Sequence, residues 1–415
     1  MITVLVAAYN GEMYIREQMD SILGQTQGGI HIVVSDDCSA DRTPEILAEY
    51  EEKYPDQVAV IRRQEPSGGA ARHFLELLGM MARMGSGGEA EAAGTAAHGR
   101  RGADGAAGAG NGGIAPSGAG NGGLAPSGAG NGGLTPSGAG NGGLAPSGAG
   151  NGGLAPSDAE NGGLVPPSTG NAPQESPCTS KIASMAQASY FMLSDQDDVW
   201  LPDKAGKLLL RMEEMERALG CEMPILVHSD LQVVDQELNC ISPSFFQYQK
   251  ISPERNALSQ LLVQNNVTGG AVMLNRPLLK LLETPPRICL MHDSWLALVA
   301  SCFGRIGWVD RPLYLYRQHG TNTLGAEKGD NLEGAGQRIK DGSQARENYR
   351  KMFGQAASLL ELYSGRLSCG QKKILTEFTK IPSRSRPGRM YAILRYGFTK
   401  NTWLRTLGQM LFIGD

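Results

Sequence analysis

A run of glycine-rich decapeptide repeats interrupts the chain and constrains how the rest can fold. Residues 108–167 are six copies of a ten-residue unit whose commonest form is GAGNGGLAPS. Between residues 85 and 170 lie 30 of the 56 glycines of the 415-residue chain, and no phenylalanine, tryptophan or tyrosine. One small aliphatic side chain per repeat cannot offset an entropy cost of about 1–2 kcal/mol per ordered residue. We therefore expect a disordered insertion at residues 85–179, and a binding or self-assembling repeat stays open as the alternative.

The overall charge and the cysteines exclude several kinds of partner and site. The chain carries 38 lysines and arginines against 42 aspartates and glutamates, a formal net charge of −4. This balance argues against nucleic acid as a partner and favours small molecules. The seven cysteines form no Cys-x-x-Cys pair, which indicates neither a disulfide scaffold nor a zinc ribbon.

The N-terminus and the hydropathy pattern bear on location. Residues 1–8 are apolar but lack the basic start and the cleavage site of a signal peptide. No uncharged run approaches the ~20 apolar residues that span a bilayer. We expect a cytoplasmic protein and leave open a peripheral position at the inner face of the plasma membrane.

Outside the insertion, strand patterns alternate with helix patterns. Apolar runs predict strands at residues 2–8, 30–34, 58–61 and 190–193. Helical spacing of apolar residues predicts helices between them, the third over residues 70–84. Such alternation is typical of an α/β fold with a doubly wound, mostly parallel sheet. The insertion therefore interrupts one domain and does not separate two.

The loops after three of these strands carry the candidate chemistry, because ligands of open α/β sheets bind beyond the carboxyl ends of the strands. The loop after the fourth strand contains Asp195, Asp197 and Asp198. Three carboxylates within four residues repel one another unless a cation lies among them, and hard oxygen ligands favour Mg²⁺ or Mn²⁺. A solvated acidic turn is the open alternative. The loop at residues 8–11 has no Gly-x-Gly-x-x-Gly pattern, which disfavours a nicotinamide-binding site.

Several motifs, in this order, resemble those of family 2 inverting glycosyltransferases. They are Ala7–Asn10 with Val4, the segment Ser35–Asp41, the segment Asp195–Trp200, and His292-Asp293. The form Asp-Gln-Asp-Asp-Val-Trp most resembles the rhamnosyltransferase-like branch. The resemblance implies a GT-A-type fold, the nucleotide-diphospho-sugar transferase fold. It also implies a catalytic domain at residues 1–84 and 180–325, followed by a helical, basic C-terminal extension at 326–415.

The resemblance implies a donor site for a dTDP- or UDP-sugar. Ala8, Tyr9 and Asn10 would line the nucleotide, and Asp37 would accept a hydrogen bond from the base. Arg72 opens the third helix, where a cation and free backbone N–H groups suit a diphosphate. Packing by Tyr9 and helix capping by Asp37 are the alternatives.

The family pattern also implies a metal site and contacts with the sugar. Asp195 would face the ribose and approach the metal, Asp197 would be the principal ligand of Mg²⁺ or Mn²⁺, and His319 would reach the metal or the diphosphate. The candidates for contact with the acceptor or the transferred sugar are Asp198, Trp200 and His292.

Asp293 is the candidate catalytic base. It precedes an apolar run at residues 296–302, so it stands at a helix N-terminus, which favours the ionised carboxylate, while burial would raise its pKa. A general base needs such a balance. The alternative is an ordinary helix-capping aspartate.

The resemblance thus implies an inverting, metal-dependent glycosyltransferase of the hexosyltransferase type. It would move a sugar, rhamnose being one candidate, to a hydroxyl of a glycan or lipid-linked acceptor in cell-surface polysaccharide biosynthesis. One alternative is a sugar nucleotidyltransferase, although residues 8–11 lack the arginine-bearing glycine-rich loop of that class. Another is a catalytically degenerate, repeat-bearing scaffold protein.

The C-terminal tail is basic. Between residues 384 and 412 six arginines and lysines occur with no acid, interleaved with aromatic and aliphatic residues. Such a segment is suited to an anionic membrane surface. A helix packed on the catalytic domain is an equal alternative.

Overall fold

A computed structural model describes residues 1–97, 177–318 and 342–413 of the chain. The decapeptide repeats, the disorder expected for them and the domain boundary expected at residues 325 and 326 lie outside these ranges. The helices and strands are β1 (Ile2–Ala8), α1 (Ile15–Leu23), β2 (Ile30–Asp36), α2 (Thr43–Lys53), β3 (Val58–Arg62), α3 (Ala70–Ala97), α4 (Pro177–Met185), β4 (Tyr190–Ser194), β5 (Val199–Trp200), α5 (Lys204–Leu219), β6 (Ile225–Val234), β7 (Cys240–Ser242), α6 (Phe245–Gln249), α7 (Leu258–Leu261), η1 (Gly269–Ala271), β8 (Val272–Asn275), α8 (Arg276–Leu279), η2 (Lys280–Leu282), α9 (His292–Phe303), β9 (Arg305–Arg317), α11 (Gly342–Leu362), α12 (Cys369–Thr379), α13 (Arg386–Tyr396) and α14 (Trp403–Phe412).

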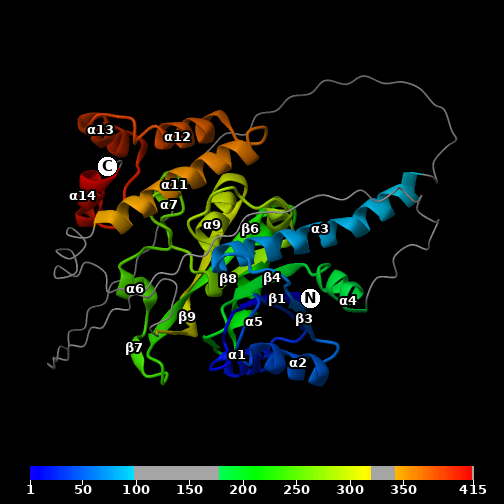
Figure 1. Ribbon diagram of the computed structural model, residues 1–415. Helices are drawn as coiled ribbons and strands as arrows, with labels where there is room; N and C mark the ends of the chain where they lie inside the picture. The colour runs from blue at the N-terminus through cyan, green and yellow to red at the C-terminus, as the bar shows by residue number, and fades with distance from the viewer. Residues whose placement is uncertain (98–176, 319–341, 414–415) are drawn as a thin grey trace, which may run out of the picture. The chain divides into compact units, whose positions relative to one another are not determined.

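The strands form one mixed sheet (Figure 1). Its order is β3-β2-β1-β4-β8-β6-β9-β5, and β7 pairs with β6. The first four strands are parallel, and Val4 of β1 lies between Ile32 of β2 and Met192 of β4. Strand β8 is antiparallel to both β4 and β6, whereas β9 is parallel to β6. The predicted α/β fold with a mostly parallel sheet is confirmed, and the antiparallel pairs lie beyond β4.

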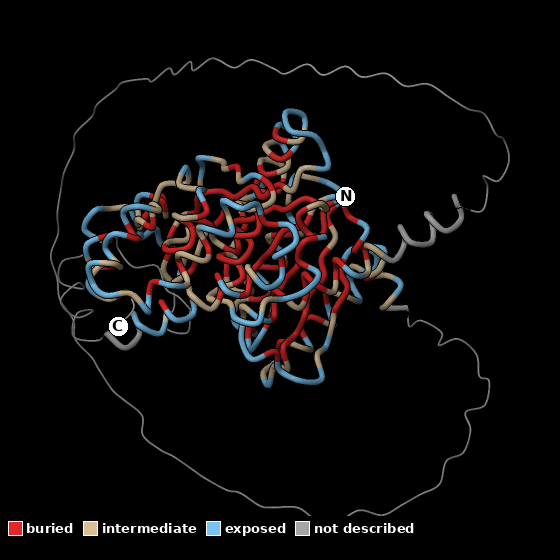
Figure 2. The backbone as a smooth tube through the Cα atoms, turned by 90° about the horizontal axis from the view of Figure 1, so that it is seen from above, coloured by how far each residue is buried: buried red, intermediate tan, exposed pale blue. Residues whose placement is uncertain are grey.

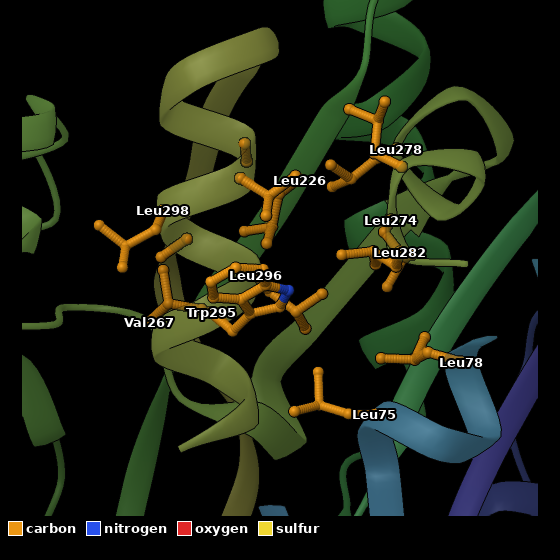
Figure 3. Close-up of a cluster of buried hydrophobic side chains, with 14 of the residues drawn as sticks. Leu75, Leu78, Leu226, Val267, Leu274, Leu278, Leu282, Trp295, Leu296 and Leu298 are labelled. Atoms are coloured by element: carbon orange, nitrogen blue, oxygen red, sulfur yellow. The ribbon is translucent and has the colours of Figure 1, made fainter. Parts of the chain in front are cut away.

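Helices cover both faces of the sheet, because successive side chains of a strand point to opposite sides. Val4 and Val6 of β1 belong to a buried cluster that includes residues of α1, α2 and α5. Leu5 belongs to a second cluster, built with α3, α9 and the C-terminal helices. Figure 3 shows this second cluster, in which Trp295 of α9 is fully buried among leucines. The strands are accordingly buried along most of their length, whereas exposed residues lie mainly at the periphery (Figure 2).

The predicted strands are present, and three of them extend further than expected. Strand β2 continues through Ser35 and Asp36, which pair with Ala7 and Ala8 of β1. Polar residues predict a loop there, but both of these side chains are buried and belong to the ladder. The sheet therefore carries polar groups up to its carboxyl edge.

The edges of the insertion differ from expectation. Helix α3 continues through residues 85–97, beyond its predicted end at residue 84, although four of these residues are glycines, which disfavour a helix. A helix that the sequence did not predict, α4, begins at Pro177 and precedes β4. It is held in place by Lys181, which donates to the Val58 carbonyl, and by the buried side chain of Ile182. The described chain thus leaves α3 and returns as a helix, not directly as a strand.

Within residues 342–413, four helices follow the sheet. Helix α11 packs against α12, and α13 and α14 lie next to each other at one end of this part of the structure (Figure 1). Leu375, Phe378 and Phe398 of this region are fully buried in the cluster that contains Trp295. In the described ranges, no helix combines the length and the apolar character that crossing a membrane requires.

Candidate active site

A pocket of about 900 Å³ opens at the carboxyl ends of β1, β2 and β4. The start of α9 and the segment before β8 close its other side. Eight of the residues that the sequence singled out line it, namely Ala8, Tyr9, Asn10, Asp37, Asp195, Asp197, His292 and Asp293. Its volume lies within the range of small-molecule sites, roughly 300–1,000 Å³.

The loop after β1 is joined to the loop after β4 by Gln196. The Tyr9 backbone N–H donates to Gln196 Oε1 (2.7 Å), and Gln196 Nε2 donates to the Tyr9 carbonyl (2.9 Å). The amide side chain thus continues the pairing of β1 with β4 beyond the last strand residues. A Cβ atom on Gly11 would lie 2.4 Å from Gln196 Oε1, so only glycine fits beside this pair. The pairing holds Tyr9, whose side chain is 56% exposed, at the rim of the pocket.

The loops after β1 and β2 are also joined. The Asn10 backbone N–H donates to Ser39 Oγ (2.9 Å), and the Ala40 N–H donates to Asn10 Oδ1 (2.8 Å). Asn10 adopts a left-handed conformation with φ of 48°, which asparagine tolerates better than most residues. Its side chain is therefore used to hold the two loops together.

Asp37 lies at the floor of the pocket and anchors the segment that follows β3. Its carboxylate accepts hydrogen bonds from the Ser67 N–H (2.7 Å) and the Ser67 hydroxyl (2.6 Å), and Arg63 Nε lies 3.0 Å from Oδ1. The side chain is almost fully buried. These donors fix the carboxylate of Asp37 as an acceptor at the floor of the pocket.

Arg72 lies away from this floor. Its guanidinium pairs with Glu76 one turn further along α3 (2.7 Å), and the side chain is 72% exposed. It does not line the pocket. The cation nearest to Asp37 is Arg63, which the sequence did not single out.

Some residues of the acidic loop after β4 line the pocket, and others lie in a layer beneath it. Asp195 and Asp197 line the pocket. Burial, and then repulsion from Asp197 and Asp293, raise the pKa of Asp195 to about 7. A cation here would relieve this repulsion, and Mg²⁺ and Mn²⁺ commonly bind one or two carboxylates together with substrate phosphates. The residues therefore fit such an ion, although among the described residues no group of three or more His, Cys, Asp or Glu side chains is arranged as a ready metal site.

Asp198 and Trp200 lie under the pocket and do not line it. Both are buried next to Lys204, which is itself fully buried. Lys204 Nζ lies 3.6 Å from the centre of the Trp200 ring and donates a hydrogen bond to the Gly270 carbonyl. Burial raises the pKa of Asp198, with further contributions from Asp197 and Asp195, and burial lowers the pKa of Lys204. These residues form a polar layer that connects the acidic loop with Gly270.

Arg317 fixes the acidic loop from the end of β9. Its backbone N–H donates to Asp198 Oδ1 (3.1 Å) and its Nε donates to the Asp197 carbonyl (2.9 Å). The same guanidinium pairs with Glu17 of α1 and is 3% exposed. His319, the third metal ligand expected from the sequence, lies outside the described residues.

Asp293 lies in the first turn of α9 and lines the opposite wall of the pocket. The Ser294 N–H donates to Asp293 Oδ1 (2.5 Å). Burial raises the pKa of Asp293 to about 6, although hydrogen bonds from the Ser294 and Gly269 backbones and from the Asn265 side chain oppose this rise. The carboxylate is therefore ionised near neutral pH and basic enough to take a proton.

His292 contributes an uncharged ring beside this carboxylate. It packs on Phe74 with the ring centres 4.2 Å apart, and burial lowers its pKa to about 3. Both ring nitrogens are buried without a hydrogen-bond partner among the described residues. A Cβ atom on Gly269 would lie 2.2 Å from His292 Nε2, so the glycine makes room for the ring.

Several residues that join loops or strands to one another were not recognised from the sequence. Gln196, Arg63, Lys204 and Arg317 each join segments that are distant in sequence, and His73 lines the pocket while its Nε2 lies 2.7 Å from Ser35 Oγ. Only Gln196 had a local signal, because it lies inside the Asp-Gln-Asp-Asp motif. The other partners become visible only once the strands are aligned.

Comparison with protein families identifies the amino-terminal part of the chain. Residues 3–76 match the family model described as Glycosyl transferase family 2. This segment runs from β1 into α3 and includes Tyr9, Asn10 and Asp37. The resemblance inferred from the sequence is confirmed over this segment, which is similar to glycosyl transferase family 2.

Curated relatives match short stretches of the chain. The chain is 38% identical over 73 residues to the dTDP-rhamnosyl transferase RfbG of Shigella flexneri, which covers 18% of this chain and 25% of that protein. It is 34% identical over 70 residues to the putative teichuronic acid biosynthesis glycosyltransferase TuaG of Bacillus subtilis, covering 17% of this chain and 27% of the relative. The match thus spans about a quarter of the length of these relatives.

Solved structures of similar proteins are distant. TarS 1-349 of S. aureus gives a TM-score of 0.44 at 12% identity, covering 98% of this chain and 74% of that one. The mannosyltransferase PcManGT of Pyrobaculum calidifontis, solved with GDP-Man and Mn²⁺, gives 0.39 at 12% identity, with coverage of 100% and 88%.

Proposed function

We propose that this protein is an inverting glycosyltransferase that moves a sugar from a nucleotide diphosphate to a hydroxyl group. The observation that carries the proposal is one pocket bounded by Asp37 and the paired aspartates on one wall and by Asp293 on the other. The family 2 match over residues 3–76 supports a nucleotide-sugar donor for the first wall. The relatives named for dTDP-rhamnosyl transfer and teichuronic acid biosynthesis favour a dTDP- or UDP-sugar, with rhamnose as a candidate, and an acceptor in cell-surface polysaccharide synthesis.

In this mechanism the nucleotide binds against β1 and β2. Tyr9 at the rim offers an aromatic face to the base, and Asp37 presents carboxylate oxygens that accept N–H donors. When bound, Mg²⁺ or Mn²⁺ would be held by Asp195 and Asp197 and would supply positive charge for the leaving diphosphate. The polar layer formed by Asp198, Lys204 and Trp200 would keep this loop in position from below.

Asp293 would accept the proton of the acceptor hydroxyl as that oxygen attacks the anomeric carbon from the face opposite the diphosphate. Only one base is then needed, and the configuration at the anomeric carbon inverts. His292 lines the pocket and burial lowers its pKa, so its ring would stay neutral beside the sugar and would not compete for the proton. Exclusion of water from the closed pocket would favour transfer over hydrolysis.

The donor is tested directly by thermal shift of the full chain with UDP-, dTDP- and GDP-sugars, each with and without Mn²⁺. We expect one nucleotide class to raise the melting temperature, and more so with the ion. Asp197→Ala should remove the metal-dependent part of that shift. No stabilisation by any nucleotide sugar would contradict the proposal.

A further inference from the structure

The last two helices present apolar side chains to solvent. On α14 the exposed fractions are 70% for Trp403, 53% for Leu404, 55% for Leu407 and 65% for Leu411. Residues four apart on a helix lie on the same side, so these four form one stripe. Large exposed apolar surfaces mark contact sites in soluble proteins.

The opposite side of α14 faces the protein and is partly polar. Thr406 and Gln409 are buried there, and Gln409 Nε2 donates to the Phe398 carbonyl (2.9 Å). A surface helix whose outer side met only water would carry its polar residues on the outer side and its apolar residues on the inner side. The polarity of α14 therefore indicates a partner for its outer side.

Helix α13 adds a second apolar stripe with cations on both sides of it. Met390, Tyr391 and Leu394 are 47–62% exposed. At 3.6 residues per turn, Arg386 and Arg395 project on either side of this stripe. Both arginines are exposed, and neither pairs with a carboxylate of the described residues. Between residues 378 and 414 the sequence contains no aspartate or glutamate.

These helices are bonded to the wall of the pocket. Arg405 of α14 donates to the Gln249 carbonyl (2.6 Å), and the Asn401 N–H donates to Gln264 Oε1 (2.8 Å). Gln249 and Gln264 both line the pocket. The helix that carries one of the exposed stripes, α14, is therefore connected to the side of the pocket where the hydroxyl acceptor would enter.

We propose that the outer sides of α13 and α14 form a docking surface for an anionic phospholipid bilayer. Here "docking surface" means Met390, Tyr391, Leu394, Trp403, Leu404, Leu407 and Leu411 with Arg386 and Arg395. The apolar stripes would enter the interface while the arginines meet lipid phosphates. A second copy of the chain suits this surface less, because self-association would bring cations together without acids to pair with them. The proposal is independent of catalysis, and only if the proposed function holds does it also bring a lipid-linked acceptor to the pocket.

Co-sedimentation of the full chain with vesicles tests the role of charge. We compare phosphatidylcholine alone with phosphatidylcholine mixed with phosphatidylglycerol, and expect binding to the mixture. The double variant Arg386→Gln/Arg395→Gln should bind the mixture about thirtyfold more weakly, because each basic residue near the membrane surface strengthens binding by about fivefold. The matched control Lys53→Gln/Arg217→Gln removes two exposed cations elsewhere and should bind as the parent does.

The apolar part is tested by a pair of leucines. Leu407→Asp should lower binding to the mixed vesicles by about tenfold or more. Leu210→Asp is the control, because Leu210 of α5 is 51% exposed, close to the 55% of Leu407. Trp403 fluorescence should shift to shorter wavelength on binding, and Trp403→Phe should remove that shift. Circular dichroism melting curves verify that each variant is folded.

Two results would overturn the proposal. One is equal binding of the parent to neutral and mixed vesicles, or no binding to either. The other is a dimer in sedimentation velocity that Leu407→Asp dissociates while vesicle binding is unchanged, which would assign the surface to a second copy of the chain.

Discussion

The two walls of the pocket are built in different ways. One wall contains Asp37 and Asp195, and we call it the donor wall after its proposed role. It comes from loops that directly follow parallel strands and are joined to one another by short contacts such as Asn10 to Ser39. The opposite wall contains Asp293, and we call it the acceptor wall after its proposed role. It is assembled from the start of α9, the turn at Gly269 and side chains such as Gln264, which accepts a hydrogen bond from the C-terminal region. The family 2 match covers part of the first wall and none of the second.

This difference separates the features of the pocket that proteins of one fold share from those that are particular to this chain. A nucleotide diphosphate is recognised at strand ends, where fixed backbone and carboxylate groups converge. An acceptor is recognised by segments that differ between proteins of one fold. Variants of the two walls should therefore fail in different ways, with turnover lost at one and donor affinity weakened at the other.

The largest effect is expected at the acceptor wall. Asp293→Asn should lower kcat by about 10²–10⁴-fold, because general-base catalysis contributes on that scale and the amide cannot accept the proton. Donor affinity measured by calorimetry should stay within about twofold, since Asn keeps the shape and still accepts from the Ser294 N–H. Retention of most of the turnover would reduce Asp293 to a helix-capping residue.

Disruption of the polar layer beneath the pocket, formed by Asp198, Trp200 and Lys204, should lower the stability of the fold. Lys204→Met leaves buried Asp198 without its neighbouring cation and removes the donor to the Gly270 carbonyl. The buried Gly270 carbonyl would then lack its donor, and leaving such a group unsatisfied costs about 1–3 kcal/mol, which chemical denaturation would measure as a lower free energy of unfolding. Lys207→Met, on the same helix but less buried, is the control and should cost about 0.5 kcal/mol or less. Equal stability of the two variants would mean that the connecting layer is not a coupled unit.

The pH dependence of turnover should separate the base from the donor site. Burial raises the pKa of Asp293 to about 6, so the base is ionised above that pH and protonated below it. At saturating donor, kcat should therefore fall by about fivefold from pH 6 to about pH 5, because the ionised fraction of a base with this pKa falls by that factor. Any residual turnover of Asp293→Asn should lack this acid limb. A parent profile that is flat between about pH 5 and 7 would rule out Asp293 as the titrating base.

The sequence predicted the donor wall better than the rest because its signals are local. An apolar strand followed at once by Tyr9-Asn10, Asp37 or Asp195 places each side chain at one edge of the sheet. The same reasoning misplaced Trp200 and Asp198, since a loop pattern does not say which residues turn inward to Lys204. It also assigned Arg72 to the donor, whereas helical spacing gives its guanidinium a partner in Glu76.

The smallest effect is expected from Gln196, which joins two donor loops but belongs to neither strand. Gln196→Ala removes both hydrogen bonds to Tyr9, each worth about 0.5–1.5 kcal/mol net when intact, and the site is partly open to water. We expect a donor Kd about fivefold weaker with kcat within about twofold, because the acceptor wall is untouched. Gln187→Ala is the matched control, as this exposed amide makes only a long contact with the Met84 carbonyl (3.4 Å) and should leave the Kd unchanged. If Gln196→Ala lowered kcat far more than donor affinity, the donor loops would have to position the reacting carbon as well as bind the nucleotide, and the two walls would not act separately.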